Sequence, residues 1–141
     1  MYLLDTDVMS ALRRADRNPR VGSWMKSISP TEAYLSVVSI GEIERGVVRQ
    51  RRKNPPHAIE LENWLGSVIG DFGERILPVT LSVAQHWGSL SGALGHNDPD
   101  LIIAATALEH RLTVVTRNVS DFLPTGVDIF DPFTGARHGL A

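Results

Sequence analysis

The sequence predicts an α/β fold in which helices cover both faces of a parallel sheet. Short apolar runs such as "YLL" at 2–4 and "LTVVT" at 112–116 alternate with longer segments of helical pattern. Strands that alternate with helices are typical of parallel βαβ units. The length of 141 residues suits one domain, which we place at 1–133. The last segment, 134–141, has no periodicity and is expected to be a flexible tail.

The individual elements follow from this alternation. The expected strands are short, mainly apolar runs that lie at 2–4, 33–39, 75–79, 112–116 and 127–130. The helical candidates between these strands lie at 7–15, 19–28, 40–52, 57–72, 82–94 and 99–110. Pro55 and Pro56 form a turn between two of these helices, because proline cannot continue the first one.

Composition excludes several classes of protein. The chain has no cysteine, which excludes disulfides and thiolate metal sites. It shows no charged leader, and no apolar run approaches the roughly 20 residues that span a bilayer. We therefore expect a cytoplasmic protein that does not contact a membrane. The formal net charge of −2 means that the overall field does not attract nucleic acid, so any such attraction must be local.

Four acidic residues are expected at one edge of the sheet. Right-handed crossovers gather the carboxyl ends of parallel strands and the N-termini of the following helices at the same edge, where ligands bind. Asp5 ends the first strand, and Glu42 opens the helix after the second. Asp100 opens the helix "DLIIAATALEH", and Asp121 follows the fourth strand. Topology alone therefore brings the four carboxylates together.

Each acid also has a structural interpretation. Ser39 and Glu42 have the spacing of a capping box. Asp7 and Asp98 are expected to act as helix N-caps, the latter because Pro99 follows it. Asp100 suits the first turn of its helix because of the helix dipole. Asp121 could end a turn that starts at Asn118.

These separate interpretations do not explain why the acids gather. Converging carboxylates repel one another and raise their own pKa values. The only lysines are Lys26 and Lys53, and neither is close in sequence to any of the acids. A divalent cation would offset the repulsion. Oxygen ligands without cysteine or paired histidines favour Mg²⁺ or Mn²⁺ over zinc.

Three segments, "LLDTDVMSAL", "VVSIGEIERGV" and "DLIIAATALEHRLTVVTRNVSDF", together resemble the PIN-domain ribonucleases, specifically the VapC-type toxins of bacterial toxin–antitoxin pairs. By this resemblance Asp5, Glu42, Asp100 and Asp121 are the catalytic and metal-binding acids. Thr6, Asp7, Asp98, Thr116 and Asn118 are the polar neighbours that would orient them or add a ligand. The family commonly has Asn where this chain has Asp7, and Asp98 is a rival to Asp100 as the closer ligand.

The resemblance implies a three-layer α/β/α sandwich, usually as a homodimer. It also implies an endoribonuclease that depends on Mg²⁺ or Mn²⁺ and uses a metal-activated water to cleave RNA, commonly tRNA or another structured RNA. A cognate antitoxin protein would silence the enzyme by covering its acidic site.

Two further groups of side chains suit such partners. Cations expected to guide the RNA backbone toward the acids are Arg13, Arg14, Arg45, Arg49 and Arg117. The segment "RGVVRQRRK" that holds two of them is also explained by a solvated helix end. Trp24, Trp64 and Trp87 are expected in the core, with a groove for a partner helix or a dimer interface as the alternative.

The sequence is also compatible with three other functions. "LLDTDV" also fits a haloacid-dehalogenase-like phosphatase with Asp5 as the nucleophile and Asp7 as the general acid. That enzyme, like a receiver-type signalling module, needs a lysine near the site, and the last third of the chain has none. A PIN-like module that only binds RNA or protein is the third alternative.

Overall fold

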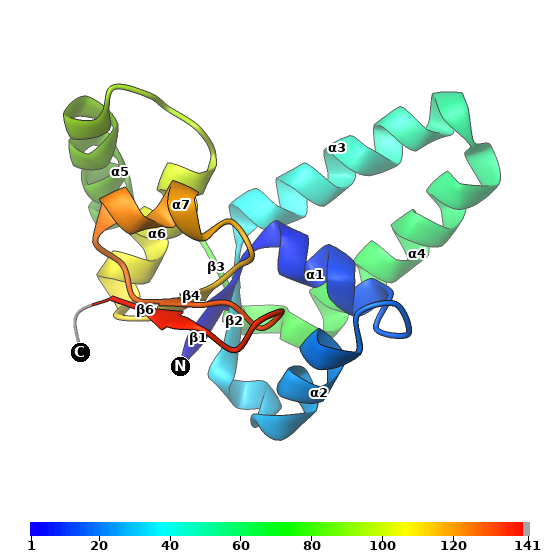
Figure 1. The fold of residues 1–141 in the computed structure, drawn as a ribbon. Coiled ribbons are helices and arrows are strands. Elements are labelled where there is room, and N and C mark those ends of the chain that lie inside the picture. The colour runs from blue at the N-terminus through cyan, green and yellow to red at the C-terminus, as the bar shows by residue number, and fades with distance from the viewer. Residues whose placement is uncertain (140–141) are drawn as a thin grey trace.

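The protein, described by a computed structural model over residues 1–139, has a six-stranded sheet between two layers of helices (Figure 1). The strands are β1 (Tyr2–Leu4), β2 (Ala33–Ser36), β3 (Ile76–Leu77), β4 (Thr113–Val115), β5 (Ile129–Phe130) and β6 (Arg137–His138). The α-helices are α1 (Thr6–Arg13), α2 (Pro19–Ser27), α3 (Val37–Lys53), α4 (Pro55–Phe72), α5 (Leu81–Leu94), α6 (Asp100–His110) and α7 (Val119–Phe122). Short 3-10 turns lie at η1 (Pro30–Glu32), η2 (Gly73–Arg75) and η3 (Leu123–Thr125).

The sheet has the order β3-β2-β1-β4-β5-β6 and is parallel except for β6. The strand order reverses at β1, which pairs with β2 on one side and β4 on the other. Ligands bind at such a switch point, outside the carboxyl ends of the strands. Asp5 therefore follows the strand that topology favours for a site.

Successive strand residues enter two separate cores. Leu4 packs with α1, α2 and α4 side chains on one face of the sheet, while Leu3 packs with α6 side chains on the other. The same alternation separates Val115 from Val114 in β4. Because strand side chains alternate between faces, a sheet covered on both sides buries every position. The predicted α/β/α sandwich with a parallel sheet is confirmed.

One predicted strand was too long. The strand expected at 33–39 ends at Ser36, and α3 starts at Val37. The hydroxyl of Ser36 accepts a hydrogen bond from the amide of Val38 at 3.1 Å and caps the helix before the β-branched pair can extend the strand. The tail expected at 134–141 contains a short strand, in which Arg137–His138 pair antiparallel with β5. Residues 140 and 141 of that tail lie outside the described residues.

The three tryptophans differ in how they pack. Trp24 packs against the first core, with its ring 5.2 Å from that of Tyr2 and 5.3 Å from that of Phe130. Trp64 also packs there and keeps part of its surface exposed. The indole nitrogen of Trp87 is buried and has no hydrogen-bond partner among the described residues. Core packing is therefore confirmed for the first two.

Within residues 1–139, none of the helices is both long and apolar enough to cross a bilayer.

Candidate functional site

Asp5 is the deepest member of the acidic site. It follows β1 and is 3% exposed, and its amide donates to the carbonyl of Val115 in β4 at 2.9 Å. Oδ1 accepts from the Thr6 amide and Oδ2 from the Thr116 hydroxyl, both at 2.8 Å. Asp5 thus caps α1 and joins β1 to β4 at the carboxyl edge of the sheet.

Burial and two neighbouring charges keep this carboxyl partly protonated. Burial is the main cause that raises the pKa of Asp5 to about 8, and the charges of Asp7 and Asp100 add to it. The hydrogen bonds from Thr116 and Thr6 act in the opposite direction. The ionised form therefore needs compensation that the chain itself does not supply. A cation bound beside Asp5 would supply it.

Glu42 reaches the site through Thr6. The Thr6 hydroxyl lies 2.7 Å from Oε1 of Glu42 and 2.9 Å from the hydroxyl of Ser39. These contacts join the first turn of α1 to the first turns of α3. The predicted capping box is wrong, because Ser36 caps α3 and Ser39 lies inside the helix. Ser39 is a buried polar neighbour of the site. Its role was not predicted, because its spacing to Glu42 indicated a capping box instead.

Asp7 lies in the first turn of α1 and does not cap it, because Asp5 occupies that position. Its Oδ2 accepts from the amide of Arg117 at 3.2 Å. Its Oδ1 is buried without a hydrogen-bond partner among the described residues. Burial raises the pKa of Asp7, and the amide of Arg117 acts against this rise. An unpartnered carboxylate oxygen beside Asp5 is an unsatisfied acceptor that a cation could satisfy.

Asp100 begins α6 and is half-buried. Burial is the main cause that raises the pKa of Asp100 to about 6, and the charges of Asp121, Glu42 and Asp7 contribute to this rise. All the predicted acids therefore interact electrostatically with this carboxyl or with Asp5. The expected crowding of negative charge at one edge is present in the structure.

Asp98 does not cap α6 with its side chain, contrary to prediction. Its carboxylate is exposed and lies 3.5 Å from Nδ1 of His96, while its backbone carbonyl accepts from the Leu101 amide at 2.9 Å. Pro99 occupies the cap position and fixes the first turn without a side-chain hydrogen bond. Asp98 therefore lies at the margin of the acidic group, and Asp100 lies within it.

Asp121 lies in the first turn of α7 and is exposed. Its amide donates to the carbonyl of Asn118 at 3.1 Å, which is the turn expected there. Asn118 makes no capping contact with its side chain, but its amide donates to the Thr116 hydroxyl at 2.9 Å. Thr116 therefore links the loop that carries Asp121 to Oδ2 of Asp5.

The residues fit a hard cation in donor type and charge, although their carboxylates do not converge on one position. Within residues 1–139 there is no group of three or more acidic or histidine side chains already close enough to hold an ion. Mg²⁺ keeps several of its waters and binds through one or two carboxylates, so it does not require a closed protein cage. The unpartnered Oδ1 of Asp7 and the raised pKa values of Asp5 and Asp100 indicate where positive charge is missing.

The predicted guide cations differ in their surroundings. The guanidinium of Arg117 lies over the ring of Phe133, 3.8 Å from its centroid, and that of Arg13 lies 5.9 Å from the Trp64 ring. Arg45 and Arg49 are exposed on α3. Arg14 is the C-cap of α1.

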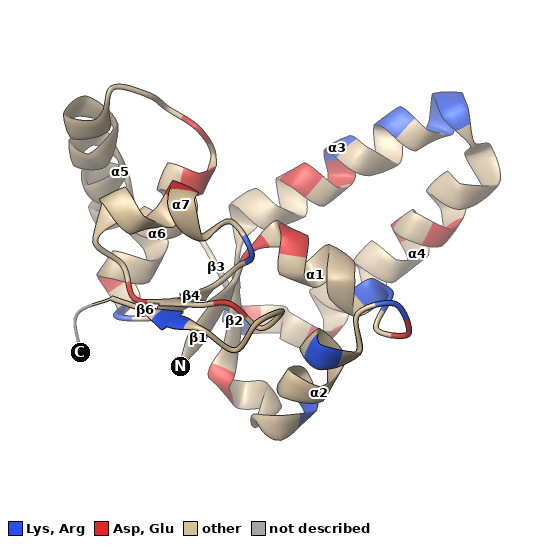
Figure 2. Ribbon diagram, viewed as in Figure 1, with Lys and Arg blue, Asp and Glu red and all other residues tan. Residues whose placement is uncertain are grey.

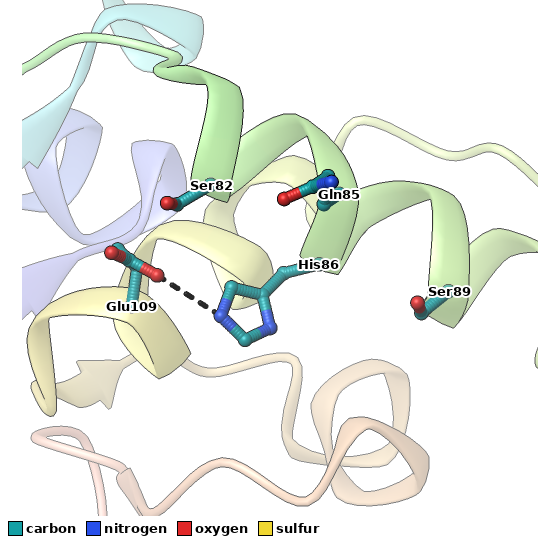
Figure 3. Close-up of a pocket in the computed structure, with 5 residues that line it drawn as sticks. All are labelled: Ser82, Gln85, His86, Ser89 and Glu109. Carbon is teal, nitrogen blue, oxygen red and sulfur yellow. Dashed lines mark hydrogen bonds and ion pairs between the residues drawn. The ribbon is translucent and has the colours of Figure 1, made fainter.

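A second pocket lies between α5 and α6 and is separate from the acids (Figure 3). It is lined by Ser82, Gln85, His86, Ser89 and Glu109. His86 Nε2 lies 3.0 Å from Oε2 of Glu109 and links the two helices. No hydrogen bond joins His86 to either serine hydroxyl among the described residues, so the pocket lacks a serine nucleophile paired with a base.

Comparison with known proteins identifies the family. The PIN domain family model matches residues 2–122. The chain belongs to the PIN-domain family. Toxin FitB of Neisseria gonorrhoeae is 36% identical over an alignment of 141 residues that covers 94% of this chain and 99% of FitB. VapC ribonuclease Y4jK of Sinorhizobium fredii is 29% identical and covers 96% of this chain and 100% of its own.

The solved structures show the same PIN-domain architecture. The crystal structure of FitAcB from Neisseria gonorrhoeae superposes with a TM-score of 0.83 at 34% identity, covering 94% of this chain and 99% of that one. The resemblance inferred from the sequence motifs is thus confirmed at the level of the PIN family. One of these relatives is named a toxin and another a ribonuclease.

Proposed function

We propose that this PIN-domain protein is a metal-dependent endoribonuclease that acts as the toxin of a toxin–antitoxin pair. The observation that carries the proposal is the acidic edge formed by Asp5, Asp7 and Asp100, whose pKa values are all raised. The names of the relatives, a toxin and a ribonuclease, support the same activity. The proposed ion is Mg²⁺ or Mn²⁺, held by Asp5, Glu42, Asp100 and Asp121.

A bound Mg²⁺ or Mn²⁺ supplies a Lewis acid for the phosphate and lowers the pKa of a bound water. The chain's own residues prepare this chemistry. Asp5 and Asp100 lose their protons as pH rises and present ionised oxygens. Thr6 holds Glu42, and Thr116 holds Asp5, so that the carboxylates keep fixed orientations. Asn118 positions the loop of Asp121, while Asp7 and Asp98 add negative charge around the set.

The experiment is RNA cleavage by the purified protein. Total RNA and isolated tRNA are incubated with the protein in Mg²⁺, in Mn²⁺ and in EDTA, and new ends are mapped. We expect discrete internal cuts that require the metal and disappear in Asp5→Asn. Cleavage that persists in EDTA or in that variant would contradict the proposal. The proposed substrate is tRNA or another structured RNA.

The partners are proposed on the same basis. An antitoxin protein that covers the acidic edge would suit a toxin of this family, and one solved structure of the same fold is described as a toxin-antitoxin complex from Klebsiella pneumoniae. We also propose a homodimer and a cytoplasmic location. Co-purification of a protein encoded next to this gene, together with loss of cleavage in the complex, tests the first point. Light scattering of the isolated protein tests whether it is a homodimer.

The alternatives have less support. A haloacid-dehalogenase-like phosphatase needs a lysine beside Asp5. Lys26 lies in the last turn of α2 and Lys53 ends the long helix α3. A PIN-like module that only binds RNA would not need several carboxylates with raised pKa values at one edge. The cleavage experiment separates these alternatives from the proposed nuclease.

A further inference from the structure

Helices α3 and α4 form a hairpin that projects from the body of the protein (Figure 1). Helix α3 starts directly after β2, carries Glu42 in its second turn and ends at Lys53 at the tip. One helix therefore connects the acidic site with the most distant part of the hairpin. Figure 2 shows acidic positions on α3 near the body and basic positions toward its tip.

The basic residues on α3 form a face that continues from Glu42. In a helix of 3.6 residues per turn, positions 42, 45, 49 and 52 lie within an arc of about 80°. Arg45, Arg49 and Arg52 are all exposed, and Lys53 lies beside them. We call these four residues the cationic face of α3. Ile43 and Val47, which α3 buries, lie on the opposite side of the helix.

The cationic face has no acidic partners. No carboxylate lies within ion-pair distance of its four members in the described part of the chain, residues 1–139. Arg51 provides the contrast, because it points toward α4 and its guanidinium lies 3.4 Å from Oε1 of Glu62. The one arginine of this segment outside the face is used within the fold, and those on the face remain available.

A helix-end explanation accounts for only part of this face. Cations in the last turn of a helix are stabilised by the helix dipole, which explains Arg52 and Lys53. The dipole effect is confined to that turn, so it does not explain Arg45 and Arg49. The net charge of −2 also makes a local concentration of unpaired cations unusual for the molecule.

The outer part of the face is hollowed. An open groove of about 490 Å³ is lined by Val48, Arg49, Arg52 and Lys53. Three cations around one concave surface suit an anionic group, since arginine matches phosphate oxygens with two parallel N–H donors. At a rise of about 1.5 Å per residue, Arg52 lies roughly 15 Å along the axis from Glu42.

We infer that the cationic face of α3 binds the phosphate backbone of the RNA strand that leaves the acidic site. The inference rests on the proposed nuclease function and adds a direction to it, because the strand runs along α3 toward the hairpin tip. The site chemistry acts at one phosphate, and the face holds phosphates several nucleotides away. These four residues are positioning residues and do not contact the scissile bond.

The test measures binding without cleavage. Asp5→Asn serves as the background, and the probe is a fluorescent single-stranded 16-nucleotide uridine RNA in EDTA, titrated at several salt concentrations. Arg49→Gln/Arg52→Gln is compared with Arg51→Gln/Lys26→Gln, which removes the same charge outside the face. For single strands the slope of log K against log salt is about 0.7 per phosphate contact, so loss of two contacts lowers it by roughly 1.4.

The expected result is binding that is weaker by about fivefold for each lost contact near 0.1 M salt, with a shallower slope. The control variant should match the background in both quantities. Equal affinity and slope in the two double variants would overturn the inference. RNA binding unaffected by Arg49→Gln/Arg52→Gln, with loss of an acidic protein partner instead, would overturn it in favour of a protein-docking face.

Kinetics distinguish failure of this inference from failure of the proposed function. In the otherwise native protein, Arg49→Gln/Arg52→Gln should raise KM for a long RNA and leave kcat unchanged. Metal-dependent cleavage with an unchanged KM would refute the cationic face and leave the nuclease proposal intact. Absence of cleavage by the wild-type protein would refute the proposed function. The binding comparison would then still decide whether α3 holds RNA.

Discussion

The hydroxyl of Thr116 donates to Oδ2 of Asp5 over 2.8 Å, although the two residues lie 111 positions apart in the sequence. The contact joins the ends of the two central strands, β1 and β4. Thr116 also accepts from the amide of Asn118, so one hydroxyl orients both the buried acid and the loop before α7. The acidic site is therefore fixed by the sheet and not by flexible loops alone.

Replacement of Asp5 by Asn should abolish cleavage and change how stability depends on pH. The folded pKa of about 8 lies above the unfolded value of 3.8, so between these values the folded state binds more protons than the unfolded state. In EDTA the wild-type protein should therefore lose stability as pH rises from about 4 to about 8. Asp100 contributes in the same direction up to about pH 6.

Thermal unfolding of both proteins in EDTA measures this effect. Asp5→Asn should melt at a higher temperature than the wild type at pH 8, and the difference should shrink toward pH 4. The matched control is Asp71→Asn, which changes an exposed acid on α4. An Asp5→Asn protein whose melting temperature follows that of the wild type at every pH would show that Asp5 is not held protonated.

Asp7→Asn should move the pH dependence of cleavage to lower pH. The charge of Asp7 is the second cause of the raised pKa of Asp5, and its removal lowers that pKa. Cleavage that needs ionised Asp5 should then begin at lower pH, measured as kcat/KM from pH 5 to 9. Asp98→Asn is the control, because Asp98 is exposed and is the last of the charges that act on Asp100. A profile that is unchanged by Asp7→Asn would separate Asp7 from the titration of Asp5.

Thr116→Val should destabilise the protein by about 1–3 kcal/mol, because it leaves an Asp5 oxygen and the Asn118 amide without their partner. It should also raise the pKa of Asp5, since this hydrogen bond opposes the effect of burial. Urea denaturation in EDTA measures the first effect and the pH profile of cleavage the second. Thr106→Val is the control, because it removes a buried hydroxyl that donates to the carbonyl of Ile102 within its own helix. This variant should leave the pH profile of cleavage unchanged.

The sequence was sufficient to predict a parallel sheet covered by helices and the edge at which the acids lie. Strand and helix alternation requires parallel crossovers, and these place Asp5 and Asp100 at one edge whatever the details of packing. Patterns of this kind depend on chain order alone. The core positions follow in the same way, because Leu3 and Leu4 must face opposite sides of one strand.

Local capping could not be predicted, because several residues compete for each helix start. Asp5, Thr6 and Asp7 all have side chains that cap helices, and the sheet register decides that Asp5 does so. For the same reason Ser36, and not Ser39, is the N-cap of α3. Strand β6 depends on pairing with β5, a tertiary contact that leaves no periodicity in a two-residue segment.

Thr6→Val tests whether Glu42 must be held by the Thr6 hydroxyl. The substitution keeps the shape of the side chain and removes the contact of 2.7 Å to Oε1 of Glu42. Loss of a residue that orients a metal ligand typically costs ten- to a hundredfold, and we expect roughly this loss in kcat at limiting Mg²⁺. Thr6→Ser retains the hydroxyl and should restore cleavage. If valine and serine gave the same rate, the hydroxyl would have no part in positioning Glu42, and the orientation of that carboxylate would depend on the packing of α3 alone.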